Sequence, residues 1–272
     1  MDAMKYIVII LCSLILIFPL YLMFIGSFQN IKGIMKMPPN FLPRNPTWDN
    51  YITLLKSIPL LRWSLNTIII SFSAVLMTVT IAFFSGYAMS FMRRRYRRII
   101  FILFLIPIMI PGQALLIPLY VTVRRMRLPD MVATVLPATF SPVSIFLCMN
   151  YIDNISRDII DAARLDGAGD LKIIFSMVVP LSKPILACIG ILSFLGTLGA
   201  YVWQYLLLRA DNQKTLLIGI TETVMRSTGQ YIMINPIGVQ LAAGVILFIP
   251  LFIVFISFQR YFQSGLTLGG IK

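Results

Sequence analysis

The sequence predicts an all-α, polytopic membrane protein, and two observations support this fold class. The chain of 272 residues is 58% hydrophobic and only 12% charged, whereas soluble proteins are about 25% charged. Six apolar segments also reach the length of about 20 residues that a helix needs to cross a bilayer. We predict a single transmembrane domain, residues 1–272, with spans at about residues 6–28, 65–92, 99–120, 132–152, 185–208 and 239–262.

The first span follows Lys5, as the apolar part of a signal peptide would. Its length and the lack of a small-residue cleavage site after it predict a retained helix. The third and fourth spans contain prolines, each of which removes a backbone donor and bends a helix. These prolines either bend ordinary helices or break them to shape a pathway through the bundle; they are Pro107, Pro111, Pro118, Pro137 and Pro142.

The turn between the second and third spans sets the predicted orientation. Its sequence, "RRRYRR" at residues 93–98, contains five arginines in six positions. Short loops rich in Lys and Arg stay on the cytoplasmic side of a membrane, so this turn and both chain ends are expected in the cytoplasm. Arg124, Arg125 and Arg127 then lie outside and count against this orientation.

Composition excludes several classes of function. The formal net charge of +13 would suit nucleic-acid binding, but in an apolar chain it indicates basic residues that face lipid head groups. The chain has no histidine, which excludes His-based triads and His-ligated metals. The three cysteines stand far apart in apolar segments and predict buried thiols rather than disulfides. We expect neither a catalytic site nor a metal site.

The connection between the fourth and fifth spans, residues 153–182, is predicted to be cytoplasmic and is about 30 residues long, whereas most helix connections have two to eight. It contains two helical patterns joined at Gly167, which suits the left-handed conformation that ends a helix. Asp158 lies in the first turn of the first helix, where a carboxylate complements the helix dipole. Half of the ten acidic residues lie in this connection: Asp153, Asp158, Asp161, Asp166 and Asp170. Of these, Asp153 and Asp170 are expected to be solvated flanks.

The second helix of this connection is expected to start at Asp170 and to end at Pro180 and Pro184. Four apolar residues share one face of it at helical spacing: Leu171, Ile174, Phe175 and Val178. In the first helix, Ala162 and Ala163 leave little side-chain bulk, so another surface can approach the backbone. The pattern therefore fits a helix pair that docks on another protein, or alternatively a solvated charged loop.

The stretch "DAARLDGAGDLKIIFSMVVPLSKP" resembles the EAA loop of ATP-binding-cassette (ABC) importer permeases, written EAAxxDGA and followed by an apolar helix and a late proline. In that family the loop forms a coupling helix that lies in a groove of a cytoplasmic ATPase. The resemblance implies an ATPase-coupling role for eight residues: Asp161, Ala162, Ala163, Asp166, Gly167, Ala168, Phe175 and Pro180. The first acid is Asp where Glu is usual, so the contact is expected to persist with less reach.

Five further stretches form a second pattern: "PTWDNY" (46–51), "LNTIIIS" (65–71), "PGQALLIPLY" (111–120), "RLPD" (127–130) and "FQRYFQSGLTLGGIK" (258–272). Together they resemble the second, MalG-like permease of maltose-type sugar importers. The resemblance implies a six-helix, type I ABC importer permease fold with a cytoplasmic coupling helix between helices 4 and 5. One segment departs from the sequence pattern of this family. This chain has Leu198-Gly199 and Trp203-Gln204 where the family commonly has Trp-Asn and Trp-Pro. Substrate contacts of relatives are therefore not transferred to this span.

The chain contains no GxxxxGK[ST] loop to cradle ATP phosphates. It is therefore expected to be a non-enzymatic transport subunit without a cofactor of its own, while a partner ATPase binds ATP and Mg. The resemblance implies a heterodimer with a second related permease, two copies of a cytoplasmic ABC ATPase and an extracytoplasmic solute-binding protein. The expected location is the cytoplasmic membrane of a prokaryote, and residues 161–180 are expected to couple the ATPase to the import of a sugar or oligosaccharide.

Polar and aromatic residues within spans are the candidates for the substrate path: Gln113, Tyr120, Asn150, Tyr201, Trp203 and Gln204. Aromatic residues near span ends also form the interfacial belt, and Gln113 is placed to satisfy a carbonyl freed by Pro111. The arginines at 124, 125 and 127 favour an anionic cargo or an acidic partner surface. The cargo stays open among an oligosaccharide, a monosaccharide derivative and glycerol phosphate.

Three other classes of protein are alternatives. A secondary transporter or channel that is not driven by ATP needs ionisable residues within its spans, and none lies clearly at mid-membrane. A membrane-embedded enzyme needs acid–base groups, which are scarce in the spans. A scaffold that only binds an ATPase-like partner is the third alternative.

Overall fold

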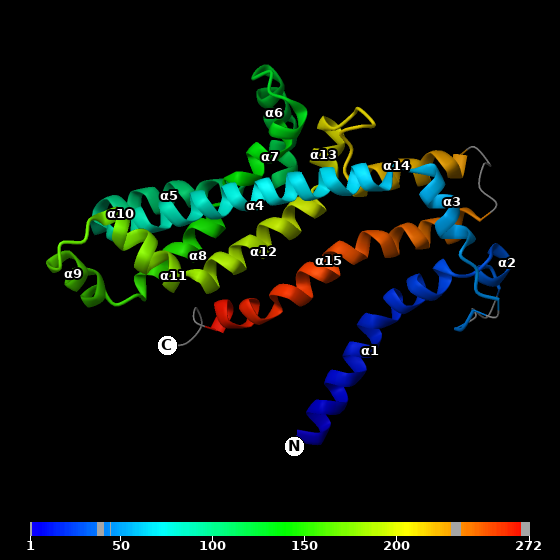
Figure 1. The fold of residues 1–272 in the computed structure, drawn as a ribbon, viewed down its shortest axis with the longest axis horizontal. Coiled ribbons are helices and arrows are strands. Elements are labelled where there is room, and N and C mark those ends of the chain that lie inside the picture. The colour runs from blue at the N-terminus through cyan, green and yellow to red at the C-terminus, as the bar shows by residue number, and fades with distance from the viewer. Residues whose placement is uncertain (1, 37–40, 44, 230–234, 268–272) are drawn as a thin grey trace. The chain divides into compact units, whose positions relative to one another are not determined.

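The computed structural model describes the backbone of residues 2–36, 41–43, 45–229 and 235–267, and every element in these ranges is helical (Figure 1). The predicted all-α class is confirmed, although the terminal stretch at 258–272 is described only to residue 267. The elements are α1 (Asp2–Ser27), α2 (Ile31–Ile34), α3 (Asp49–Ser57), α4 (Leu60–Phe91), α5 (Arg94–Met109), α6 (Gly112–Arg125), α7 (Asp130–Thr139), α8 (Pro142–Asp153), α9 (Arg157–Leu165), α10 (Asp170–Ile173), the π-helix η1 (Ile174–Val178), α11 (Val179–Leu181), α12 (Lys183–Gly199), α13 (Tyr201–Leu207), α14 (Leu216–Gly229) and α15 (Pro236–Thr267).

Three helices among the described residues are long and apolar enough to cross a membrane: Met4–Ser27 in α1, Leu60–Phe91 and Pro236–Ser257 in α15. Up to six crossings result if each of three bent helix pairs counts as one. The bends are 100° between α5 and α6, 46° between α7 and α8, and 73° between the segment Asp170–Leu181 and α12. The first two bends lie inside the third and fourth predicted spans, and the third bend lies at Ser182, before the fifth predicted span at 185–208.

Proline explains two of these breaks. A residue before proline is driven out of the helical conformation by the proline ring. Ile110, before Pro111, has φ −90° and ψ 123°, and Ser141, before Pro142, has φ −121° and ψ 101°. The other three prolines that were expected to bend or break spans lie inside helices without ending them: Pro107, Pro118 and Pro137.

The chain divides into two compact units, and the first consists of Met1–Leu65 and Lys214–Phe252. Its buried cluster joins α3 and the start of α4 to α14 and α15: Leu54, Ile58, Trp63, Leu216, Ile220, Val239, Ala242 and Ala243. A buried amide fixes the chain after α1, because Asn50 Nδ2 donates to the Ser27 and Gln29 carbonyls at 2.8 and 2.9 Å. Asn235 Nδ2 donates to Asn50 Oδ1 at 2.9 Å.

This first unit also contains a buried ion pair that sequence reasoning missed. Lys214 is only 3% exposed, and its Nζ lies 2.5 Å from Glu222 Oε2. A buried ammonium is tolerated where a carboxylate neutralises it.

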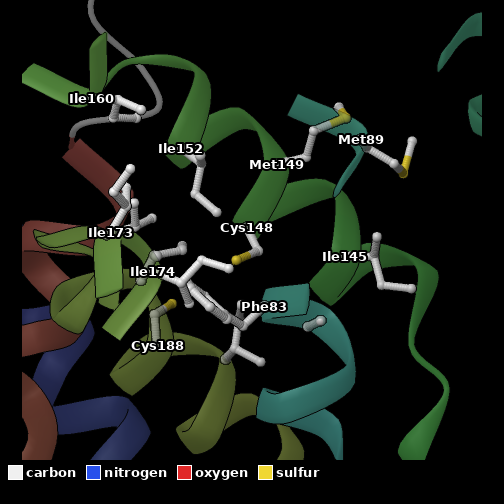
Figure 2. Packing of buried hydrophobic residues seen from close by; sticks show 14 of the residues in the cluster. Phe83, Met89, Ile145, Cys148, Met149, Ile152, Ile160, Ile173, Ile174 and Cys188 are labelled. Atoms are coloured by element: carbon white, nitrogen blue, oxygen red, sulfur yellow. The ribbon is translucent and has the colours of Figure 1, made fainter. Parts of the chain in front are cut away.

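The second unit, Asn66–Gln213 with the chain from Ile253, has its core between α4, α8, α9, α10 and α12. Figure 2 shows this cluster, in which Phe83 and Cys148 lie beside Ile174 and Cys188. The two buried thiols confirm the prediction for these cysteines. Cys12 is instead exposed on α1, because the first unit leaves the apolar surface of that helix uncovered.

Small residues on α4 let its backbone approach α8. Ala82, Gly86 and Ser90 recur every four residues and share one face. A Cβ on Gly86 would lie 2.9 Å from the Met149 backbone nitrogen. Ser90 Oγ donates toward the Gly86 and Met149 carbonyls at 2.9 and 3.2 Å. Close backbone approach at small residues is the usual way in which membrane helices associate.

Gly86→Ala is therefore expected to destabilise the second unit. The added methyl group meets backbone atoms, which cannot rotate away, and overpacking of this kind costs about 1–3 kcal/mol. Thermal unfolding of the purified protein in detergent measures the effect, with Gly196→Ala as the control because a Cβ there has nothing within 4 Å. Equal stability of the two variants would contradict the close approach of α4 and α8.

Candidate functional site

The connection at residues 153–182 lies at one end of the second unit, beside the turn between α4 and α5 (Figure 1). The Arg97 guanidinium pairs with the Asp153 carboxylate where α8 ends. The predicted solvated role of Asp153 is thus wrong, because an arginine from the "RRRYRR" turn neutralises it. The two segments that sequence reasoning assigned to the cytoplasm are therefore neighbours.

The helix α9 ends at the predicted glycine. Gly167 has φ +80°, and its amide bonds to the Arg164 carbonyl while the Ala168 amide bonds to the Ala163 carbonyl, both at 3.0 Å. This pair of bonds is the Schellman motif, which needs a left-handed residue at the position of Gly167. The sequence DGA thus turns the chain sharply and exposes Asp166 and Gly167.

The two faces of α9 differ in exposure. Ile160 and Ala163 are buried in the core of the second unit, and Ala168 packs against the same core. At 100° per residue the opposite side contains Asp158, Asp161, Ala162 and Leu165, which are all exposed. We call these four residues the outer face of α9. Ala162 thus lies on a free surface, whereas Ala163 and Ala168 face the chain's own core.

Leu165 is the residue of the outer face that sequence reasoning missed. Its side chain is 90% exposed, more than any other large hydrophobic residue described. The sequence indicates this exposure, because Leu165 follows Asp161 by four residues and therefore lies on the acidic face of the helix and not on the buried face. It occupies a variable position of the family motif, so the resemblance to that motif assigned it no role.

Two arginines of α9 attach this helix to the end of α4. Arg157 Nη2 donates to the Ser90 carbonyl at 2.6 Å, and its guanidinium lies 4.6 Å from the centre of the Phe91 ring. The Arg164 guanidinium lies 6.0 Å from the same ring. A guanidinium within about 6 Å of an aromatic face is attracted to it. A force on α9 therefore reaches α4 directly, in addition to the chain connection to α12.

The second helix does not bury the face that its apolar spacing predicted. Ile174 and Val178 are buried, but Leu171 and Phe175 are 70% and 59% exposed. The reason is a wider turn, because the Val179 amide bonds to the Ile174 carbonyl five residues earlier. This π-helical turn, η1, shifts the side-chain register relative to an α-helix.

The break before α12 lies at Ser182, with φ −87° and ψ 0°, between the two prolines expected to end the helix. Pro180 is exposed, and Pro184 lies in the first turn of α12, where proline is tolerated. Asp170 starts α10 as predicted and remains largely solvated, with its carboxylate 3.4 Å from Arg164.

Two of the substrate-path candidates have structural partners instead. Gln204 is 2% exposed, and its Nε2 donates to the Thr197 carbonyl at 2.5 Å, which bridges the break between α12 and α13. Trp203 Nε1 donates to the Thr134 carbonyl at 3.1 Å and so ties α13 to α7. The departure from the family sequence at these positions thus coincides with internal packing.

The other four candidates lie on three helices, α6, α8 and α13. Tyr201 stacks on Tyr205 with ring centres 5.8 Å apart, and Tyr120 packs near Trp203 against a small buried cluster. Asn150 is half-buried on α8, and Gln113 is exposed at the start of α6. None of the six therefore has a geometry that identifies it as a sugar ligand.

Arg124, one of the arginines that favoured an anionic cargo, is occupied within the chain. Its Nη1 lies 2.6 Å from Asp130 Oδ1, and its Nη2 donates to the Leu207 carbonyl at 3.3 Å. A cation at the last carbonyls of α13 complements the negative end of that helix.

Comparison with known proteins adds a consistent set of similarities. Residues 78–268 match the family model described as "Binding-protein-dependent transport system inner membrane component". The chain is 32% identical to the arabinooligosaccharides transport system permease protein AraQ of Halalkalibacterium halodurans, over 96% of this chain and 92% of that protein. It is 31% identical to the maltodextrin transport system permease protein MdxG of Bacillus subtilis, over 98% and 95%. A crystal structure of a bacterial ABC transporter involved in the import of the acidic polysaccharide alginate superposes with a TM-score of 0.84 at 25% identity, covering 96% of both chains.

Proposed function

The chain belongs to the family of binding-protein-dependent transport system inner membrane components, and we propose that it is the permease subunit of an ATP-driven importer of oligosaccharides. Relatives named for arabinooligosaccharides and maltodextrin are 32% and 31% identical to this chain, whereas one named for sn-glycerol-3-phosphate is 25% identical, which supports an oligosaccharide over glycerol phosphate. In this proposal the cargo site lies between this chain and a second permease.

The complete transporter consists of this chain, a second related permease, two copies of a cytoplasmic ATPase that bind ATP and Mg, and an extracytoplasmic solute-binding protein. Binding of oligosaccharides to the companion solute-binding protein tests the cargo. We expect arabino- or malto-oligosaccharides to bind, measured by calorimetry on the purified protein. Binding of a glycerol phosphate with no binding of oligosaccharides would reject this cargo class.

One observation supports the coupling role above all others: the outer face of α9 leaves a leucine 90% exposed at the end of the unit that contains the arginine-rich turn. On a cytoplasmic loop this side chain has no lipid to contact, so a groove on another protein is its natural environment. Leu165, Ala162 and Asp161 contact the ATPase in this proposal, whereas Ala163 and Ala168 hold α9 against the permease core.

The movement follows from the attachments of α9. Closure of the ATPase dimer pulls on the outer face, and the bonds of Arg157 to Ser90 and Phe91 transmit this pull to α4. The chain through Ser182 transmits it to α12. The two helices thereby shift together between inward-open and outward-open arrangements, which are the two states that nucleotide binding biases.

Gly167→Val tests this coupling. A Cβ at position 167 meets nothing within 4 Å, so the variant acts only through the strain of φ +80°, about 1–2 kcal/mol for an ordinary side chain and more for a β-branched one. We expect reduced uptake and reduced stimulation of the ATPase, while the two permeases still assemble. Gly169→Val is the matched control, because Gly169 has an extended backbone with φ −70° and equal open space. Unchanged uptake and ATPase stimulation in Gly167→Val would sink the coupling role.

A further inference from the structure

An apolar cavity of about 100 Å³ lies between α5 and α8 in the second unit. Its walls come from three helices and include Met89, Phe101, Leu105, Ile108, Val143 and Phe146. Leu105, Ile108 and Val143 are 39%, 48% and 48% exposed, so the cavity opens to the outside of the unit. In Figure 2, Met89 and Ile145 mark this edge of the core, away from Ile160 and Ile173.

The lining excludes the cargo as occupant. Sites for sugars need polar groups that fix the hydroxyls, and every residue that lines this cavity is apolar. An apolar cavity of about 150 Å³ takes up a ring as large as benzene, so this one suits a short run of methylene groups. An acyl chain provides such a run on the lipid-facing side of a membrane helix.

Two arginines share the face of α5 that lines the cavity. Phe101, Leu105 and Ile108 recur at helical spacing, and Arg94 and Arg98 lie seven residues before Phe101 and Leu105. With a rise of 1.5 Å per residue, Arg98 is about 5 Å along the helix axis from Phe101. Side chains lean toward the N-terminus of their helix, so both guanidinium groups extend toward the head-group side of the cavity.

Positive charge remains available at this end. Arg97 is neutralised by Asp153, but Arg94 and Arg98 are exposed and have no acidic partner within 4 Å among the described residues. Two cations beside an apolar cavity, which we also call the groove, can bind a molecule that has an anionic head and an apolar chain. The positive end of the α5 dipole adds to the same attraction.

We propose that this groove binds one anionic phospholipid from the leaflet at the arginine-rich end. Its phosphate lies between Arg94 and Arg98, and one acyl chain lies along Phe101, Leu105 and Ile108 toward Val143. With the orientation predicted from the arginine-rich turn, this is the cytoplasmic leaflet. The proposal itself does not depend on the cargo or on the coupling role of α9.

Spin-labelled phosphatidylglycerol and phosphatidylcholine, added to the complete transporter in vesicles of phosphatidylcholine, test the proposal. The ratio of their association constants measures the preference for the anionic lipid. Arg94→Gln with Arg98→Gln is expected to lower this ratio about 25-fold, because each basic residue near a membrane surface contributes about fivefold. Arg125→Gln with Arg127→Gln, which removes two exposed arginines from the α6–α7 turn, is expected to change it less than twofold.

The groove is tested separately by Val143→Trp, which fills the cavity and leaves the arginines in place. We expect this variant to lose at least tenfold in lipid preference. Val132→Trp is the matched control, because Val132 is also 48% exposed and does not line the cavity. Free glycerol phosphate is expected not to displace the labelled lipid, since it lacks the acyl chain. If Val143→Trp lowers the amount of assembled transporter, Ile108→Phe replaces it in the same measurement.

Any one of four results would overturn the proposal. In the first, the preference for phosphatidylglycerol is unchanged in the Arg94 and Arg98 variant. In the second, the preference falls equally in the Arg125 and Arg127 control, which would indicate general charge attraction. In the third, the variants at Val143 and Ile108 retain full lipid preference, which would mean that the acyl chain does not bind in the cavity. In the fourth, the same variants block association with the second permease but not lipid binding, which would make the cavity part of a subunit interface.

Discussion

Leu165→Asp is expected to reduce oligosaccharide uptake at least about a hundredfold. The side chain is 90% exposed and is the only large apolar residue on the outer face of α9. An anchor of this kind contributes about 2 kcal/mol or more to an interface, and a carboxylate in an apolar groove adds a desolvation penalty. Uptake of labelled oligosaccharide into cells measures the effect, together with the amount of ATPase that copurifies with the permease.

Leu61→Asp is the matched control for this prediction. Leu61 is a leucine of similar exposure, 76%, at the start of α4 and outside the loop. We expect its variant to retain uptake within about threefold, since it removes no interface anchor. Retention of the ATPase and of uptake in Leu165→Asp would contradict the assignment of the outer face as a docking surface.

Arg157→Met is expected to separate ATPase binding from transport. Methionine keeps the length of the side chain but loses the bond to the Ser90 carbonyl and the contact with the Phe91 ring. A charge-assisted hydrogen bond contributes about 1.5–3 kcal/mol, and a cation–π contact at a partly exposed site adds about 0.5–1 kcal/mol. We therefore expect uptake to fall about tenfold to a hundredfold while the ATPase still copurifies, because the outer face is unchanged.

Two comparisons sharpen the Arg157 result. Phe91→Leu removes only the ring and is expected to cause a smaller loss, and the double variant is expected to resemble Arg157→Met, because both changes remove one shared contact. Arg95→Met, at an exposed arginine of the neighbouring turn, is expected to leave uptake unchanged. Loss of the ATPase from the Arg157 variant would instead make this arginine part of the docking surface.

Local chemistry made much of the loop predictable. Gly167 is the clearest case, because the sequence DGA offers one residue that adopts φ +80° without strain. Asp158 lies in the first turn of α9, and α10 starts at Asp170, as charge and spacing indicated. Helix ends are set by nearby residues, so a short sequence determines them.

Features that depend on distant contacts were not predictable from the sequence. Asp153 is neutralised by Arg97 from another helix, and nothing local to Asp153 indicates that partner. The π-helical turn η1 moved Phe175 to the surface, and a change of helical register is invisible to a count based on 3.6 residues per turn. Gln204 resembled a ligand for a sugar because burial of its amide depends on the break after α12.

Photo-cross-linking from position 165 in the intact transporter tests the central claim most directly. A photoreactive phenylalanine analogue at this position is activated in membranes that contain the second permease, the ATPase and the solute-binding protein. We predict one main adduct, with the ATPase subunit, and no such adduct from the same analogue at position 61. An adduct with the second permease, or none with the ATPase while it remains bound, would contradict the proposal that ATP-driven force enters this chain through α9.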